Sequence, residues 1–278
     1  MADVWQWDET LFLGSAPYYA RGRLRYPAGL ADAMADALKL DGRGRLLDVG
    51  CGPGTIALRL AHRFKEVVGV DPDPGMLAEA QRLAAERGVG NVRWVRARAE
   101  ELPAGLGTFR VATFSRSFHW MDRDRVAAIV REMLEPGGAF VQPSDMPDLV
   151  LEPDASLPHP APPTDTITTI VRRYLGAKRR AGQGVRISSP DNEEAVLLAA
   201  GFAPSERVLV PGSEIVVRTI DDVLAHTFSN SGSAPHLFGD RVREFEHNVR
   251  RALAIASPSG LFAERTRDTE IRIWRKPR

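Results

Sequence analysis

A cluster of glycines and acids near residue 50 has the residue types and spacing of a site for a small ligand. Residues 46–54 read Leu-Leu-Asp-Val-Gly-Cys-Gly-Pro-Gly, an apolar run followed by a glycine at every second position. Glycines let a backbone approach a ligand closely, and the helical pattern that begins after Gly54 would add the unpaired N–H groups of a helix N-terminus. Asp71 ends the next apolar run, where a carboxylate can accept hydrogen bonds from two adjacent ribose hydroxyls. The pattern therefore predicts a nucleotide-type ligand.

The position of Asp48 and the glycine spacing argue against a dinucleotide. A dinucleotide turn reads G-x-G-x-x-G, but here the third glycine comes one residue early and an acid precedes the first. An acid is unfavourable beside a diphosphate and favourable beside a cationic amine. A dinucleotide site, or a tight turn with an incidental acid, remain the alternatives.

With this motif the chain resembles the class I S-adenosylmethionine-dependent methyltransferases. The resemblance implies S-adenosylmethionine as cofactor and S-adenosylhomocysteine as product. It also implies a doubly wound α/β sheet of seven mostly parallel strands, the Rossmann-like methyltransferase fold, with helical insertions after strand 5 and between strands 6 and 7. The cofactor contacts expected from the motif and the next strand tip are Asp48, Gly50, Cys51, Gly52, Gly54, Asp71 and Pro72. Cys51 is expected to be a small buried filler of the turn; a nucleophile is the alternative.

Two other segments resemble cofactor-binding parts of the same family. The Tyr/Arg-rich segment that ends in Tyr26-Pro27 nominates Tyr19 and Arg23 as contacts to the methionine carboxylate, which a guanidinium matches well. A solvated basic loop is the alternative. The aromatic residues of 1–20 are expected to form either a lid over the ligand or a cap on the core.

The loop 98–103 is expected to contact the adenine end of the cofactor. In the family this loop reads the adenine edge, so Ala99 and Glu100 are expected contacts, although Arg98 stands where an acid is usual. Met76 is expected either to pack on the adenine face or to belong to the core.

The tip of the strand predicted at 109–114 should face the transferred methyl group, because ligands bind beyond the carboxyl ends of parallel strands. Ser115 at this tip is a candidate cofactor contact. The Asn/Asp-Pro-Pro-Tyr/Phe sequence of amino-methylating DNA and RNA enzymes is absent here, and the His119-Trp120 pair is similar to small-molecule members such as trans-aconitate methyltransferase-like proteins. His119 is a candidate catalytic base, since an unperturbed imidazole titrates near neutrality, or a packed side chain.

The elements that would position these residues alternate between strand and helix, which predicts a parallel sheet with helices on both faces. Predicted strands are 45–49, 66–70, 91–95, 109–114, 139–142, 205–219 and 263–274. Four segments are expected: an N-terminal lid and first helix (1–40), the cofactor-binding core (41–142), a Pro-rich lid and helix insertion (143–190), and the rest of the core sheet (191–278) with a helical insertion at 220–258. Residues 143–163 contain seven prolines and are expected to be irregular.

The residues of the two insertions do not identify the molecule that accepts the methyl group. A helix is predicted from about 167 to Gly182, and its basic cluster at 172–180 either binds an acidic substrate or is a solvated face. We expect transfer of a methyl group to an O, N or C atom of a small molecule. The alternatives are the same fold binding S-adenosylmethionine for another chemistry or none, a nicotinamide-dependent oxidoreductase, and an RNA-modifying enzyme.

The composition of the chain limits the kinds of partner that it is expected to bind. Lys and Arg number 37 against 36 Asp and Glu, so no global field indicates nucleic acid or membrane. The chain starts without a signal-like segment and has no run of membrane-spanning length, which favours a cytoplasmic protein. His226, His236 and His247 lack metal-ligand spacing, so no metal is expected. The oligomeric state is left open, with a homodimer among the options.

Overall fold

A computed structural model describes residues 8–146, 154, 156–185 and 192–278, and it divides the chain into two compact units. One unit contains residues 28–146, 188–211 and 268–278; we call it the sheet unit. The other contains residues 1–27, 147–187 and 212–267; we call it the helical unit. The predicted insertion 220–258 falls in the helical unit, as do most residues of the predicted insertion 143–190.

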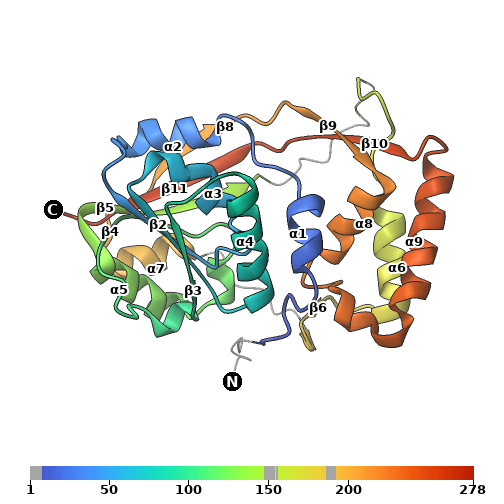
Figure 1. The fold of residues 1–278 in the computed structure, drawn as a ribbon, viewed down its shortest axis with the longest axis horizontal. Coiled ribbons are helices and arrows are strands. Elements are labelled where there is room, and N and C mark those ends of the chain that lie inside the picture. Colours follow the sequence, from blue (N-terminus) through green and yellow to red (C-terminus); the bar gives the residue numbers. More distant parts are fainter. Residues whose placement is uncertain (1–7, 147–153, 155, 186–191) are drawn as a thin grey trace. The chain divides into compact units, whose positions relative to one another are not determined.

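The sheet unit is built on seven strands in the order β3-β2-β1-β4-β5-β11-β8 (Figure 1). The strands are β1 (Arg45–Val49), β2 (Glu66–Asp71), β3 (Val92–Arg96), β4 (Phe109–Thr113), β5 (Leu134–Asp145), β8 (Glu206–Val210) and β11 (Thr269–Arg275). The first five pair in parallel, whereas β11 runs antiparallel to both β5 and β8. The predicted Rossmann-like fold is confirmed.

Helices cover the central strands β1, β2 and β4, which are buried along almost their whole length. The helices are α2 (Leu30–Leu38), α3 (Thr55–Leu60), α4 (Pro74–Glu86), α5 (Arg123–Met133) and α7 (Glu193–Ala199), with short 3₁₀ turns η1 (Ala61–Arg63), η2 (Ala99–Glu101) and η3 (Phe118–Trp120). Leu46, Leu47 and Val49 of β1 are fully buried. Phe114, just after β4, stacks on Phe140 of β5 with ring centroids 4.2 Å apart, which anchors the strand tip that leads into η3.

Several predicted element boundaries are wrong. The predicted strand 205–219 is two strands, because β8 ends at Val210 and β9 (Ile215–Thr219) begins a separate sheet with β10 (Leu261–Arg265). Pro211 between them has no N–H to continue a ladder. The predicted strand 263–274 is likewise divided between β10 and β11. The expected irregular segment begins later than 143, since Pro143 still pairs with Ile271 in β5.

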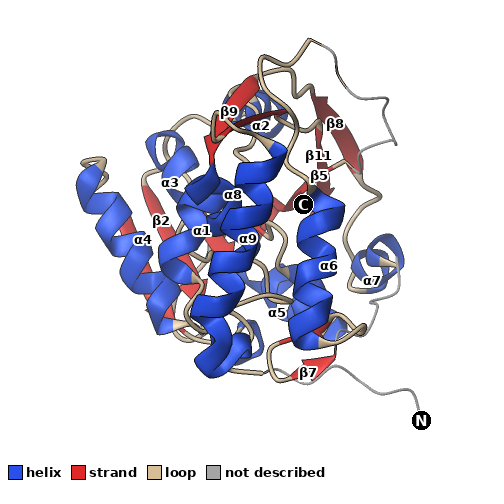
Figure 2. Cartoon of the chain, turned by 90° about the vertical axis from the view of Figure 1, so that its right-hand side faces the viewer, coloured by secondary structure: helices blue, strands red, loops and turns tan. Residues whose placement is uncertain are grey.

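The helical unit contains α1 (Ala16–Gly22), α6 (Thr164–Leu175), α8 (Ile220–Phe228), η4 (Pro235–Arg241) and α9 (Val242–Ala256). Figure 2 shows α1, α8, α9 and α6 as neighbours, with α8 against α1 and α9, and α9 against α6. Their apolar faces form one core around Phe228, Phe238 and Phe245. The predicted helix end at Gly182 is wrong: α6 ends at Leu175, and Gly182-Gln183 is the two-residue turn of the hairpin β6 (Arg180–Ala181) and β7 (Gly184–Val185).

The N-terminal aromatics are partly explained by this core. Tyr18 of α1 packs on Phe228 with ring centroids 5.0 Å apart, as the cap interpretation expects. Trp5 and Trp7 lie outside the described residues.

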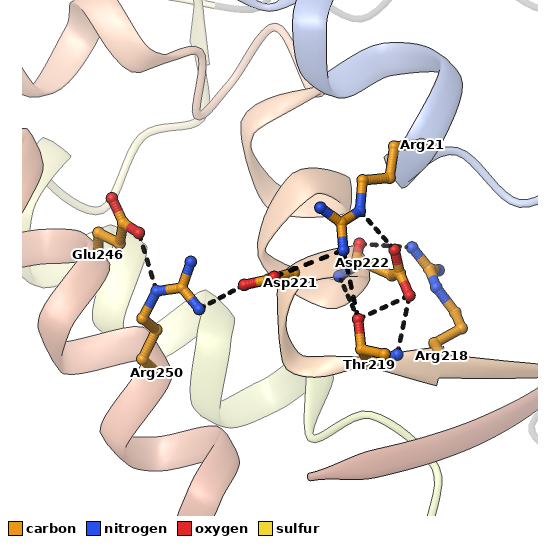
Figure 3. Close-up of polar contacts among 7 residues, drawn as sticks. All are labelled: Arg21, Arg218, Thr219, Asp221, Asp222, Glu246 and Arg250. Atoms are coloured by element: carbon orange, nitrogen blue, oxygen red, sulfur yellow. Dashed lines mark hydrogen bonds and ion pairs between the residues drawn. The ribbon is translucent and has the colours of Figure 1, made fainter.

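Ion pairs join the helices of this unit (Figure 3). Arg21 of α1 pairs with Asp222 of α8 at 2.6 Å, and Arg250 of α9 pairs with Asp221 of α8 at 2.5 Å. Arg218 is buried and donates to the backbone oxygens of Gly22 and Asp222 at 2.5 and 2.7 Å. A buried guanidinium is costly unless it is paired in this way, so the network specifies how α1 meets α8.

Candidate functional site

The glycine turn of residues 50–54 joins β1 to α3 at the carboxyl edge of the sheet. Gly50, Gly52 and Gly54 have φ values of +66°, +53° and +79°, a region that L side chains rarely adopt. The amides of Gly50 and Cys51 both donate to the carbonyl oxygen of Val70, at 2.8 and 3.0 Å, which ties the turn to the end of β2. Gly54 is the N-cap of α3. The sequence-predicted strand, turn and helix are confirmed.

The first two glycines serve different purposes. A Cβ on Gly50 would lie 2.5 Å from the Cβ of Ser117, so Gly50 is required by the packing of the protein itself. A Cβ on Gly52 would meet no other atom of the described residues within 4 Å. Gly52 therefore presents bare backbone to open space, a surface that a ligand can approach.

Asp71 lies at the end of β2 and is buried there, although it is an acid at a strand tip. Its side chain is buried, and its two oxygens accept hydrogen bonds from the backbone N–H groups of Gly52 at 2.8 Å and Asp73 at 2.9 Å. Burial raises the pKa of Asp71 to about 6, against the lowering effect of these two amides. Each carboxylate oxygen has a second lone pair, so Asp71 can hold the turn and still accept from a ligand.

Asp48 is the second buried carboxylate of the turn. It accepts hydrogen bonds from the Thr113 hydroxyl at 2.7 Å and from the Ala57 amide at 3.1 Å, which joins β1 to β4 and to the first turn of α3. Burial, with a smaller contribution from the charge of the nearby Asp71, raises the pKa of Asp48 to about 6. A direct contact between Asp48 and the cofactor stays a prediction.

Cys51 between these acids is a buried thiol. Burial raises its pKa well above the ordinary value, and the charges of Asp71 and Asp48 act in the same direction. A thiol that keeps its proton is a poor nucleophile, which supports the filler interpretation.

The raised pKa values of Asp48 and Asp71 predict how the stability of the fold depends on pH. Because the folded chain holds these protons to higher pH than the unfolded chain does, we expect the free energy of unfolding to fall as the pH rises from about 4 to above 6. Asp48→Asn keeps an acceptor without the charge, so its stability relative to wild type should rise by about 1–3 kcal/mol over this range. Urea unfolding at pH 4.5 and 7.5 measures this. The exposed Asp36→Asn is the control, and identical pH profiles for Asp48→Asn and wild type would contradict the prediction.

The loop after β4 forms the next part of the carboxyl edge. Ser117 is buried, and its hydroxyl donates to the carbonyl oxygen of Val49 at 2.7 Å, directly before the glycine turn. Sequence reasoning missed Ser117 and Thr113, because neither residue type marks a contact to a strand more than 60 residues away. Ser115 is half-buried at this tip.

His119 lies in η3 beside Trp120, with ring centroids 4.6 Å apart. The turn is anchored by Phe118, which is fully buried against Phe114 and Phe140. Both His119 and Trp120 are half-buried. The packed and the catalytic interpretations of His119 are both compatible with this geometry.

The predicted adenine-end residues lie on the same unit. Met76 and Ala99 are buried, Met76 on the inner face of α4. The Glu100 carboxylate accepts the Asp122 amide at 2.9 Å and lies 3.5 Å from the Arg98 guanidinium. Asp122 in turn caps α5 by accepting from the Arg125 amide at 3.2 Å. Pro72 is half-buried, and its carbonyl accepts from Arg96 at 3.3 Å.

Tyr19 and Arg23 belong to the helical unit. The Arg23 guanidinium lies over the Tyr19 ring, 4.9 Å from its centroid, and donates to the carbonyl oxygen of Ser229 at 2.8 Å. Their predicted contact with the cofactor carboxylate stays a prediction.

Metal-binding clusters and membrane-spanning helices are both absent from the described residues. No group of three or more His, Cys, Asp and Glu residues in these parts of the chain could hold a metal ion. None of the helices within the same residues combines the length and apolarity needed to cross a membrane.

Comparisons with known proteins agree with this site. Residues 46–138 match the methyltransferase domain family. The chain is 32% identical over 187 residues to a demethylmenaquinone methyltransferase of Thermus thermophilus, an alignment that covers 60% of this chain and 78% of that protein. It is 35% identical over 132 residues to an uncharacterized methyltransferase of Mycobacterium tuberculosis, covering 47% of this chain and 51% of the relative. The chain thus spans about half the length of the mycobacterial relatives it matches.

The fold agrees as well. The chain is similar to the solved structure of a putative type II methyltransferase from Anaeromyxobacter dehalogenans, with 92% of this chain and 99% of that chain covered, a TM-score of 0.55 and 24% identity. Together, the glycine turn, the sheet order and the relatives define a class of protein. The chain belongs to the class I S-adenosylmethionine-dependent methyltransferases.

Proposed function

We propose that this protein transfers a methyl group from S-adenosylmethionine to an O, N or C atom of a small-molecule acceptor. One observation carries the cofactor part: Gly52 presents bare backbone to open space beside the buried carboxylate of Asp71. A ribose with two hydroxyls suits the free lone pairs of Asp71, and a ligand can approach the turn where Gly52 has no side chain. The family and its named methyltransferase relatives support the same cofactor.

The other assignments extend along the carboxyl edge of the sheet. In the proposal the backbone of 50–54 cradles the methionine part, Pro72 and Met76 border the adenine, Ala99 and Glu100 read its edge, and Ser115 lies near the methyl group. Tyr19 and Arg23 would hold the carboxylate. Asp48 would act through the turn, since it is more deeply buried than Asp71 (1% against 8% exposed) and its oxygens already accept hydrogen bonds from Thr113 and Ala57.

The main contribution of the protein to catalysis would be to position the two reactants. S-adenosylmethionine supplies a methyl group that is already activated by its sulfonium. The residues of the site have to orient the acceptor in line with that methyl group, and positioning of this kind supplies roughly 7–11 kcal/mol. We also propose that the protein belongs to the trans-aconitate methyltransferase-like branch of the family, whose members act on small molecules.

Calorimetric titration with S-adenosylhomocysteine, with NADH as comparison ligand, tests the cofactor. We expect micromolar binding of S-adenosylhomocysteine and none of NADH. Binding of NADH alone would overturn the assignment of residues 46–54. If S-adenosylhomocysteine binds but no methylated product forms with any acceptor screened, the fold serves another chemistry, and the transfer part of the proposal fails.

His119 is the proposed base for acceptors that must lose a proton. With an acceptor that gives methylated product, we expect His119→Gln to lower turnover at least tenfold and to leave S-adenosylhomocysteine affinity unchanged, because a general base contributes about 10²–10⁴-fold. The loss of turnover at low pH that protonation of a catalytic base causes should be absent in the variant. A drop in melting temperature with unchanged turnover would instead show that His119 only packs on Trp120.

A further inference from the structure

The helical unit contains a cavity of about 410 Å³ that the methyl-transfer proposal does not use. One wall is a face of α6 that presents Ile167, Val171 and Leu175, and the wall continues into the loop 176–180. The facing wall is the end of α8 and the loop that follows it, including His226 and Asn230. The volume is in the range of sites for small organic molecules.

Positive charge is concentrated on this cavity. Arg172, Lys178, Arg179 and Arg180 all line it, and no acidic residue among the described part of the chain does so. Arg172 and Lys178 are exposed and form no ion pair with any residue that the structure describes. The Arg180 guanidinium donates to the carbonyl oxygen of Gln183 at 2.9 Å, so its charge is not neutralised. Like charges gathered at one concave surface attract an anion.

The facing wall adds no opposing negative charge. His226 is mostly buried, and its Nδ1 lies 3.1 Å from the carbonyl oxygen of Gly22, so Nδ1 carries the proton and donates. Burial, together with the positive charges of Arg23 and Arg218, lowers the pKa of His226 to about 4. The imidazole is therefore neutral at physiological pH, and the amide of Asn230 is engaged with the His226 carbonyl at 2.7 Å.

We propose that this cavity binds a small carboxylate with an apolar body, whose head group pairs with Arg172 and Lys178 and whose body covers Ile167, Val171 and Leu175. A single negative charge fits better than a phosphate dianion, because α6 and α8 both end at the cavity and their C-terminal carbonyls carry partial negative charge. The apolar face of α6 gives the body of the ligand a surface that an inorganic anion could not cover.

Calorimetric titration of the full chain with sodium octanoate tests the proposal. We expect octanoate to bind at millimolar concentration or below, and 1-octanol and inorganic phosphate to bind at least tenfold more weakly. The double variant Arg172→Gln/Lys178→Gln should weaken octanoate binding at least tenfold. Arg173→Gln is the matched control: this neighbouring arginine is also exposed but does not line the cavity, so affinity should stay within twofold.

A second pair of variants tests the location. Thr168→Trp places a large side chain in the cavity and should abolish octanoate binding, whereas Thr166→Trp, exposed on the same helix outside the lining, should not. Equal binding of octanol, an equal effect of Arg173→Gln, or retained binding in Thr168→Trp would each overturn the proposal. The readout is binding of the probe, so the result is independent of whether the protein transfers methyl groups.

Discussion

Gly52→Ala is expected to weaken S-adenosylhomocysteine binding at least a hundredfold while it lowers the free energy of unfolding by only about 1–2 kcal/mol. The stability cost is the ordinary penalty for an L side chain at a positive φ, here +53°. No packing cost is added, because a Cβ at this position meets no described atom. The affinity loss follows because the new methyl group would occupy the space in which the proposed ligand contacts the backbone.

Gly88→Ala is the control that separates the effect of backbone strain from the effect of lost ligand contact in Gly52→Ala. Gly88 also has a positive φ, +65°, and open space where its Cβ would be, but it lies after α4, away from the glycine turn. Both variants should lose similar stability in urea unfolding, and only Gly52→Ala should lose affinity in calorimetry. Gly50→Ala should be the most destabilised of the three, because its Cβ would collide with Ser117 at 2.5 Å. Wild-type affinity in Gly52→Ala would remove the observation on which the cofactor site rests.

Asp71→Ala is expected to reduce S-adenosylhomocysteine affinity about a hundredfold and also to destabilise the fold by about 1–3 kcal/mol. The affinity loss corresponds to about 2.7 kcal/mol, a reasonable value for two hydrogen bonds from ribose hydroxyls to a charged acceptor. The stability loss arises because the amides of Gly52 and Asp73 would lose their acceptor in a buried place.

Asp73→Ala is the control for this double effect. The Asp73 carboxylate caps α4 by accepting from the amides of Gly75 at 2.7 Å and Met76 at 3.1 Å, so its removal should cost about 1 kcal/mol. Its side chain is not part of the proposed cofactor site, and affinity should stay within about threefold. If Asp71→Ala and Asp73→Ala lose affinity to the same degree, the effect of Asp71 is structural and the ribose assignment fails.

Much of the sheet unit could be predicted from the sequence because its signals are local. The strand, glycine turn and helix of residues 45–60 depend on neighbouring residues: an apolar run, positive φ values that glycine adopts without cost, and a helical apolar period. The Asp122 cap is equally local, since its side chain reaches an amide three residues away. These features sufficed to name the class of protein.

Long-range pairing could not be predicted in the same way. Residues 205–219 have a strand pattern on both sides of Pro211-Gly212, yet β8 pairs with β11 and β9 pairs with β10, in two different sheets. The choice of partner depends on which apolar face each strand buries, and that is decided by segments about 50 residues further along the chain. The same reason explains why Asp71, an acid at a strand end, is buried: the Gly52 amide reaches its carboxylate only when β1 and β2 are paired.

Residue types at fixed short spacings identify the class of protein and the turn that carries its cofactor motif, so both can be recognised before the chain is folded. The groups that those residues contact depend on the tertiary structure. It gave Gly50 and Gly52 different roles, turned two acids into buried anchors with raised pKa values, and brought the basic cluster at 172–180 to the edge of a cavity. Burial and charge environment are properties of packed surfaces, and packing joins residues that are far apart in the chain.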